Sequence, residues 1–214
     1  MAAGRPRGFD MTHALDRAME TFWRKGYEGA SLADLTAAMG INSPSLYAAF
    51  GSKEGLFRAV LDHYDKTRAG FLNHVLEADT AREAAERFLF GLVEKATGPE
   101  NPPGCLLIQA GTGCGEESSA IPLEVARHRA GAELALRERF ECAKADNDLP
   151  KGTDSAALAR YLMAVSNGMC VHAAAGASRK DLRQTAEFAL AAWPVKEARK
   201  ARGRAAKPRE TVES

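Results

Sequence analysis

Four cysteines carry the widest choice of chemistry in this 214-residue chain: Cys105, Cys114, Cys142 and Cys170. Soft thiolates bind Cu(I), and a thiol with a lowered pKa reacts with oxidants. Cys105 and Cys114 flank one short segment, so they form a candidate metal or redox pair. No C-x-x-C pair occurs, which predicts reduced thiols. Because free cysteine is among the most buried residue types, simple packing is the alternative interpretation for each of them.

Residues 111–115, Gly-Thr-Gly-Cys-Gly, resemble a phosphate-binding loop only in their glycine content. They lack the third glycine of a dinucleotide fingerprint and the Gly-Lys-Ser/Thr of a Walker loop, and no predicted strand precedes them. Neither an acid–base pair nor a nucleophile–histidine–aspartate arrangement stands out in the sequence. We therefore predict that the protein is not an enzyme, and that residues 111–119 form a loop near an effector cavity.

The stretch 31–53 predicts two short helices joined by a tight turn. Ser31 suits the N-cap of the first helix, and Gly40 suits its C-cap because glycine enters the left-handed region at little cost. Ser43 is a candidate N-cap for the second helix, and Pro44 suits the first helical position. The chain therefore starts, stops and restarts a helix within about twenty residues.

The second of these helices has an apolar side and a small or polar side. Leu46 and Phe50 are one turn apart and are expected to pack inward. The side chains left to face outward are Ser43, Ser45, Tyr47, Ala48 and Ala49. This is the shape of a helix-turn-helix, whose second helix enters a DNA major groove. A helical hairpin within a bundle is the alternative interpretation.

Hydrophobic spacing predicts helices along the rest of the chain and no strands. A first helix over about 10–25, capped by Asp10 or Thr12, braces the pair, and Ser52 caps a fourth helix. Lys53 lies in the first turn of that helix, where it can reach a phosphate. Further helices are expected over about 80–95, 105–110, 122–147, 155–175 and 179–193. These elements predict an all-α fold.

Bulk charge does not decide the function. The net charge is only +1, and the first 60 residues also carry +1, so a DNA-binding surface depends on where charges are placed. The apolar share of 45% is ample for a core. No apolar run is long enough to span a bilayer, and no hydrophobic segment follows the N-terminal arginines, so we expect a cytoplasmic protein without membrane contact.

The organisation follows from these patterns. We predict a basic arm at 1–9, a helix-turn-helix domain at 10–52, a helical effector-binding and dimerisation domain at 53–194, and a disordered basic tail at 195–214. In the arm, Arg5 and Arg7 can follow a narrow minor groove. A disordered terminus is the alternative for that segment.

The last two predicted helices, about 155–175 and 179–193, are rich in small residues. These include Ala164, Gly168, Ala173, Ala174, Ala175, Ala189, Ala191 and Ala192. Small side chains let helices approach closely, so two such helices per subunit suit a four-helix homodimer interface. Packing inside a monomer is the alternative.

The run FWRKGYEGASLADLTAAMGINSPSLYAAFGSKEGLFRAVL resembles the N-terminal domain of the TetR/AcrR family of bacterial transcriptional regulators. The resemblance covers about residues 9–64. It rests on Phe22, Gly26, Tyr27, Ser31, Leu35, Ala38, Gly40, Ser45, Leu46, Tyr47, Phe50, Lys53 and Leu56. The segments GRPRGFD, ALDRAMETFW, KEGLFRAVLDHY and PPGCLLI are similar to the subgroup that contains a copper-responsive repressor of an outer-membrane gene.

The resemblance implies a role for each matching position. Ser31 and Leu32 would touch backbone phosphates, and Tyr47 and Lys53 would hold phosphates. The residues that would meet base edges or thymine methyl groups are Ser43, Pro44, Ser45 and Ala49, with Ala48 beside them. Because Ala48 and Ala49 are short and the helix has no arginine or glutamine, specificity is expected to depend on apolar contacts, the arm and DNA shape.

The resemblance therefore implies a homodimeric repressor that leaves a palindromic operator when a small molecule binds its C-terminal domain. The candidate effector contacts are Cys105, Gln109, Cys114, Met163, Asn167 and Cys170. We expect no resident cofactor and no metal, and the effector's identity stays open. The first alternative is a metal- or redox-responsive repressor that switches through Cys105 and Cys114. The second is a helical binding protein or enzyme that does not bind DNA.

Overall fold

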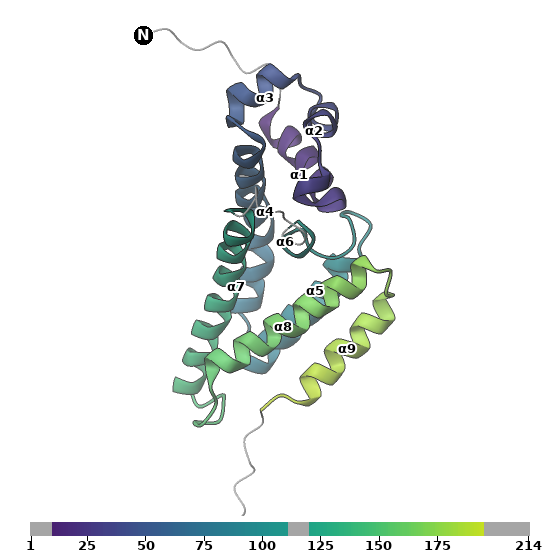
Figure 1. Ribbon diagram of the computed structural model, residues 1–214. Helices are drawn as coiled ribbons and strands as arrows, with labels where there is room; N and C mark the ends of the chain where they lie inside the picture. The colour runs from purple at the N-terminus through teal and green to yellow at the C-terminus, as the bar shows by residue number, and fades with distance from the viewer. Residues whose placement is uncertain (1–9, 111–119, 195–214) are drawn as a thin grey trace, which may run out of the picture.

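The computed structural model describes residues 10–110 and 120–194, and every regular element within them is an α-helix. The helices are α1 (Met11–Gly29), α2 (Leu32–Met39), α3 (Ser43–Phe50), α4 (Lys53–Leu76), α5 (Ala81–Thr97), α6 (Leu106–Gln109), α7 (Ala120–Ala145), α8 (Ser155–Ala174) and α9 (Arg179–Ala191). Figure 1 shows α1–α3 at one end of the molecule and α9 at the other, with α4 reaching from the first part into the second. The all-α prediction is confirmed, whereas the predictions for 1–9, 111–119 and 195–214 lie outside the described residues.

Helix α1 forms the core of the first part. Asp10, rather than Thr12, is its N-cap, and its carboxylate accepts from the Thr12 N–H at 2.9 Å. Phe22 is buried against Phe57 of α4, with ring centroids 5.0 Å apart. The helix was expected to end near residue 26. Instead Gly26 interrupts it with φ 70° and ψ 174°, a conformation that favours glycine, and the trace continues to Gly29.

The starts of α2 and α3 are set by local side-chain caps. Ser31 and Asp34 exchange hydrogen bonds with each other's backbone N–H at 3.1 Å, which forms a capping box, and Gly40 is left-handed as predicted. The prediction that Ser43 caps α3 was wrong. Asn42 is the N-cap, because its amide oxygen reaches the Ser45 N–H at 2.9 Å.

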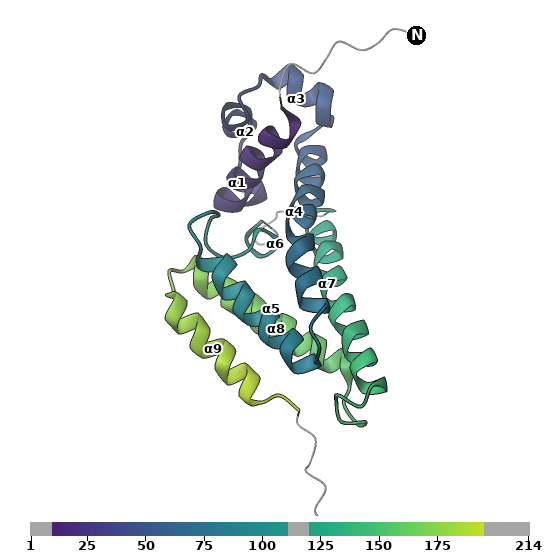
Figure 2. The same cartoon turned by 180° about the vertical axis from the view of Figure 1, so that it is seen from behind.

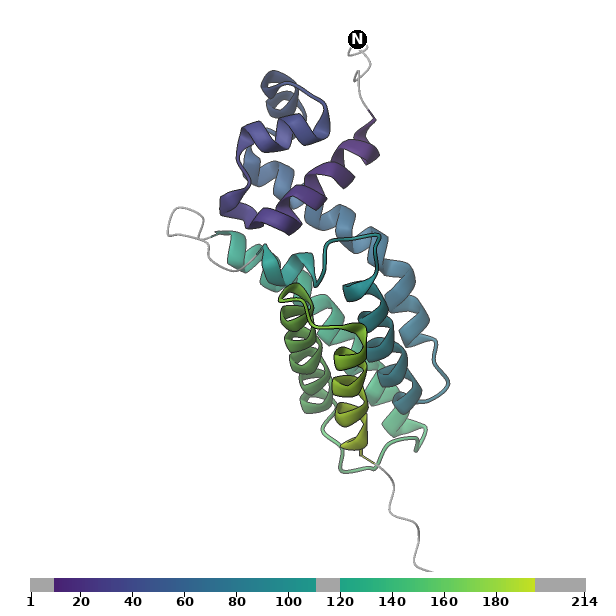
Figure 3. The same ribbon diagram turned by 90° about the vertical axis from the view of Figure 1, so that its right-hand side faces the viewer.

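The second part is a helical bundle. Helix α5 packs against α4, α8 and α9, while α7 packs against α4 and α8. Helices α8 and α9 run side by side, as Figures 2 and 3 show from two directions. The expected helix at 105–110 is α6. Helix α9 ends at Ala191, before the predicted end, and Trp193 beyond it still packs on Phe140 with ring centroids 5.6 Å apart.

Candidate DNA-binding surface and effector cavity

Helix α3 presents a small polar face at the end of the molecule farthest from the end of α9 (Figure 1). Leu46 is completely buried and anchors the helix, whereas the Tyr47 side chain is 48% exposed. Of the other predicted DNA contacts on α3, Ser43, Pro44 and Ala48 are exposed, and Ser45 and Ala49 are half-buried. Because Asn42 supplies the cap, the Ser43 hydroxyl is not used to start the helix. This face therefore keeps its hydroxyl groups and methyl groups available for a partner.

The N-terminus of α2 carries two further predicted DNA contacts. The Ser31 hydroxyl donates to Asp34 Oδ2 at 2.7 Å, so the capping box already uses it. Lys25 Nζ lies 2.7 Å from Asp34 Oδ1, and this contact, with the Ser31 hydrogen bonds, lowers the pKa of Asp34 to about 2. Leu32 is half-buried and is the first residue of α2, so its N–H has no partner within the helix. That N–H is the group at this position suited to a phosphate.

Lys53 is held at the start of α4 by contacts with the end of α1. Its Nζ lies 4.5 Å from the centroid of the Tyr27 ring and 3.5 Å from the Glu28 carbonyl oxygen. These contacts orient the ammonium group at the start of α4. Arg5 and Arg7, the predicted minor-groove contacts, lie outside the described residues.

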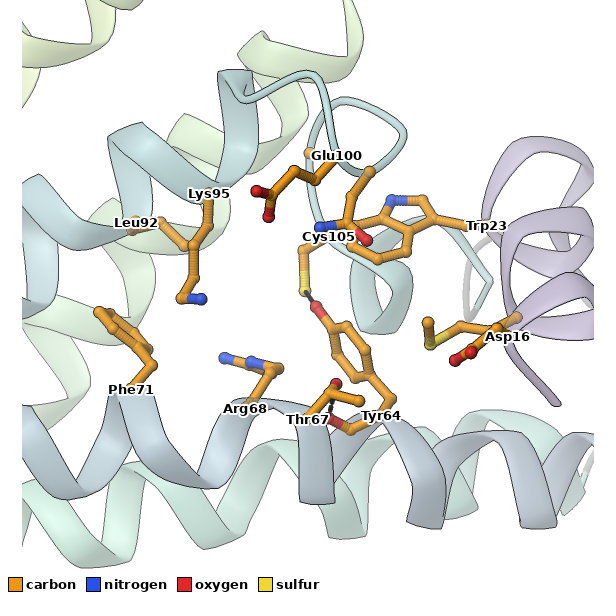
Figure 4. Close-up of a pocket in the computed structure, with 13 residues that line it drawn as sticks. Asp16, Trp23, Tyr64, Thr67, Arg68, Phe71, Leu92, Lys95, Glu100 and Cys105 are labelled. Atoms are coloured by element: carbon orange, nitrogen blue, oxygen red, sulfur yellow. Dashed lines mark hydrogen bonds between the residues drawn. The ribbon is translucent and has the colours of Figure 1, made fainter. Parts of the chain in front are cut away.

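A cavity of about 300 Å³ lies where the first part of the molecule meets the second. Figure 4 shows it between α1, α4, α5 and the loop before α6. Its lining residues are Asp16, Met19, Trp23, Tyr64, Thr67, Arg68, Phe71, Leu92, Lys95, Glu100, Asn101, Gly104 and Cys105. Volumes of this size accommodate small organic ligands. An occupant would touch helices from both parts of the protein at once.

Cys105 is the nucleophilic group of this cavity. The buried sulfur lies 3.3 Å from the Tyr64 hydroxyl, which can donate a hydrogen bond to it. A hydrogen bond from Cys170 lowers the pKa of Cys105, burial opposes that effect, and the Arg68 charge and the Tyr64 hydroxyl lower the pKa further. The Cys170 pKa is raised in turn, first by its hydrogen bond to Cys105 and then by burial. The pair therefore favours a thiolate at Cys105 and a thiol at Cys170.

A smaller neighbouring cavity brings together most of the predicted effector contacts. Cys105, Met163, Asn167 and Cys170 all line it. Gln109 is not among its lining residues, and its Nε2 instead donates to the Pro103 carbonyl at 2.7 Å. Cys114 lies outside the described residues.

Most polar residues of the larger cavity were not predicted from the sequence. Arg68 stacks over Tyr64, one turn before it on α4, with 4.9 Å between the guanidinium carbon and the ring centroid. Lys95 of α5 lies 5.3 Å from the centroid of Phe71 in the same way. The tyrosine–arginine spacing of four was a usable signal, because residues four apart meet on a helix face. The proximity of Lys95 and Trp23 to these residues depends on packing between distant segments.

Helices α8 and α9 expose large apolar side chains among small ones. Phe188 of α9 is 72% exposed, and Val171 and Tyr161 of α8 are also exposed. The exposed small residues between them include Ala164, Gly168, Ala174 and Ala191. An exposed apolar surface of this kind is typical of a protein–protein interface.

Residues 10–110 and 120–194 contain neither a clustered metal site nor a membrane-spanning helix. No group of three or more histidine, cysteine, aspartate or glutamate side chains is arranged to hold a metal ion there. Within the same ranges, no helix has both the length and the apolar composition that crossing a bilayer requires. The predicted Cys105–Cys114 metal pair is not tested by this result, because Cys114 is not described.

Comparisons with known proteins place these features in a family. The family model described as "Bacterial regulatory proteins, tetR family" matches residues 14–60. The chain is 37% identical over 193 residues to the HTH-type transcriptional repressor ComR of Escherichia coli (strain K12), covering 89% of this chain and 92% of that protein. The chain belongs to the TetR family. The predicted family is thereby confirmed, and so is the prediction of a transcriptional regulator rather than an enzyme.

Solved structures of TetR-family regulators agree with this assignment. A cysteine mutant of the regulator CifR, complexed with 26-bp double-strand operator DNA, is 44% identical with a TM-score of 0.86, covering 89% of this chain and 100% of that one. A TetR regulator from Rhodococcus sp. RHA1 is 47% identical with a TM-score of 0.57, covering 86% and 99%. The narrower resemblance to a copper-responsive subgroup stays a prediction.

Proposed function

We propose that the protein is a homodimeric TetR-family repressor that binds a palindromic operator and leaves it when a small molecule occupies the cavity between its two parts. The observation that carries this proposal is the exposed Ser43–Tyr47–Ala48 face of α3, set on a helix-turn-helix. It acts where its operator DNA is, in the cytoplasm. The 44%-identical regulator CifR, solved with operator DNA, supports the same mode of binding.

Contacts at the operator divide into positioning and reading. Tyr47, Lys53 and the start of α2 would hold phosphates, while Ser43, Pro44 and Ala49 would meet base edges. The short side chains of Ala48 and Ala49 cannot form a bidentate pair with guanine or adenine. Sequence preference would therefore depend on thymine methyl contacts, the arginines of the arm and the shape of the DNA.

The α8–α9 surface supports a homodimer. Phe188 and Val171 are exposed on adjacent helices, and burying them against a second copy would remove apolar area from water. Two copies would present two α3 helices to successive half-sites. An occupant of the cavity would release DNA by favouring a dimer with a different half-site spacing.

A mobility-shift assay with the DNA upstream of the protein's own operon tests the DNA-binding role. The double variant Tyr47→Phe, Lys53→Ala should weaken binding by about tenfold or more, because it removes two phosphate contacts. The salt dependence should fall as well. Lys151→Ala is the matched control, because Lys151 is exposed in the turn between α7 and α8. No specific complex at low salt, or equal binding by the double variant, would contradict the proposal.

A thiol switch is the second candidate, because Cys105 has a lowered pKa and lines a cavity. Peroxide or Cu(I) would then modify or bind this sulfur and release the operator. Replacing Cys105 and Cys114 with serine should abolish release by these agents. Cys142→Ser is the matched control, because Cys142 is exposed on α7. Unchanged release in the double serine variant would exclude the thiol switch and leave the DNA-binding role intact.

A further inference from the structure

Arg68 occupies the meeting point of several cavities. It lines the 300 Å³ cavity and also the smaller one that contains Cys170. Within the described residues it forms no ion pair, and its guanidinium is held by stacking on Tyr64. Asp65, whose charge acts on Arg68, is bonded to His128 Nδ1 at 2.6 Å. The arginine is therefore oriented but not neutralised by a carboxylate.

A second cation faces the same space. Lys95 points into the cavity from α5, opposite Arg68 on α4 (Figure 4), and the described residues likewise give it no ion pair. Two carboxylates also line the cavity. Asp16 is bonded to His63 Nε2 at 2.7 Å, and Glu100 is exposed on the loop before α6. Arg68 and Lys95 thus form no ion pair with either of these carboxylates. The acidic groups that raise the pKa of Arg68 are Tyr64 first, and then Cys105 and Asp65.

The remaining walls are apolar and aromatic. Met19 and Trp23 contribute from α1, Phe71 from α4 and Leu92 from α5. Such walls favour a ligand with a flat apolar body, and an arginine fork matches a carboxylate in a bidentate manner. We propose that this cavity binds a small aromatic carboxylate, with its charge between Arg68 and Lys95 and its ring against the aromatic walls.

This inference rests on the proposed function, because it names the chemical class of the effector. The ligand would contact α1, which belongs to the DNA-binding part, and α5, which belongs to the helical bundle. It would also introduce a negative charge next to Cys105, so binding should favour the protonated thiol there. Occupancy would therefore change the contacts that join the two parts.

Tryptophan fluorescence provides a direct test. Trp23 lines the cavity, whereas Trp193 packs on Phe140, so Trp193→Phe leaves Trp23 as the reporter. Benzoate should produce a saturable change, and benzamide, which has the same shape without the charge, should bind about tenfold more weakly. Arg68→Gln should weaken benzoate binding by about tenfold or more, and Arg68→Lys by less. Glu100→Gln should strengthen it, because a negative charge is removed from the cavity wall.

Several outcomes would overturn the inference. Equal affinity for benzoate and benzamide, unchanged affinity in Arg68→Gln with a wild-type circular dichroism spectrum, or no response to benzoate would each do so. Inorganic phosphate binding as tightly as benzoate would indicate a bare anion site instead. If the wild-type protein binds its operator but not benzoate, this inference fails and the proposed regulator stands. If it binds benzoate but no operator, the proposed function fails.

Discussion

The DNA-binding end and the cavity differ in how their side chains are held. At the DNA-binding end, Ser31 bonds Asp34, Asn42 bonds Ser45 and Ser52 bonds Gly55, each pair only three residues apart. At the cavity, Tyr64 contacts Cys105 and Asp65 contacts His128, across 41 and 63 residues. Local sequence thus specifies the candidate DNA-binding surface, and long-range packing specifies the cavity.

The two regions also differ in how completely their polar groups are satisfied. The three caps above satisfy backbone donors at the starts of α2, α3 and α4. Trp23 Nε1 at the larger cavity and His128 Nε2 at the smaller one are buried without a hydrogen-bond partner among the described residues, although His128 Nε2 lies 4.0 Å from Asp62 Oδ1. Unpaired buried polar groups cost free energy, so those at the cavities are open to a ligand's hydrogen bonds. The starts of α2, α3 and α4 are thus fully capped, whereas the cavities retain polar groups that a ligand could satisfy.

The largest expected loss of stability comes from a buried residue of the DNA-binding end. Leu46 is completely buried in α3, so Leu46→Ala should lower the free energy of unfolding by about 2–5 kcal/mol. Urea unfolding measures this loss, and operator binding should fall with it. Leu123→Ala is the matched control: Leu123 is 75% exposed, and the same change there should stay within about 0.5 kcal/mol. Equal effects at both positions would contradict the buried position of Leu46.

Gly26 joins the two regions and provides the next test. Its φ of 70° and ψ of 174° suit glycine, and a Cβ there would lie 3.6 Å from the Gln109 carbonyl oxygen of α6. Gly26→Ala should therefore lower stability by about 1–3 kcal/mol through backbone strain rather than through a clash. Gly29→Ala, three residues on without a positive φ, should be neutral or stabilising by up to about 1 kcal/mol. Thermal unfolding of both variants decides this, and a harmless Gly26→Ala would remove the strain argument.

Removing the Asn42 cap of α3 should have a smaller effect on stability. Asn42→Ala should lower stability by about 1 kcal/mol, because the Ser45 N–H loses its acceptor. Ser43→Ala should leave stability unchanged while it weakens operator binding. Chemical unfolding and the mobility shift separate the two roles. If Ser43→Ala lowered stability and Asn42→Ala did not, Ser43 would be the N-cap, as the sequence predicted.

The sequence predicted the helices well because their signals are local. Ser31 with Asp34, Gly40 and the spacing of Leu46 and Phe50 each act within one or two turns, and the structure has helices where they indicate them. The error at Asn42 is also local. Two good capping residues are adjacent there, and both arrangements put Pro44 in a first turn that needs no proline N–H.

The cavity could be predicted only in part. Cys105, Met163 and Cys170 were chosen from the sequence, and they do line one space. Arg68 and Lys95 were missed, because their common orientation depends on how α4 packs against α5. Gln109, also predicted as an effector contact, donates to the Pro103 carbonyl oxygen, and its predicted role stays a prediction.

The smallest expected change in stability comes from comparing two capping boxes, one in each part of the molecule. Asp34 and Asp181 both bond the preceding serine, but only Asp34 also has a lysine, Lys25, at 2.7 Å. The pKa of Asp34 is lowered to about 2, so its stabilising contribution is complete above the ordinary value of 3.8 and is lost as pH falls through about 2. Asp34→Asn should therefore lower the Tm at pH 7 more than Asp181→Asn does, and its difference from wild type should shrink as the pH falls below 4. A difference that stays constant down to pH 2 would show that hydrogen-bond geometry, not the charge of Asp34, holds the start of α2.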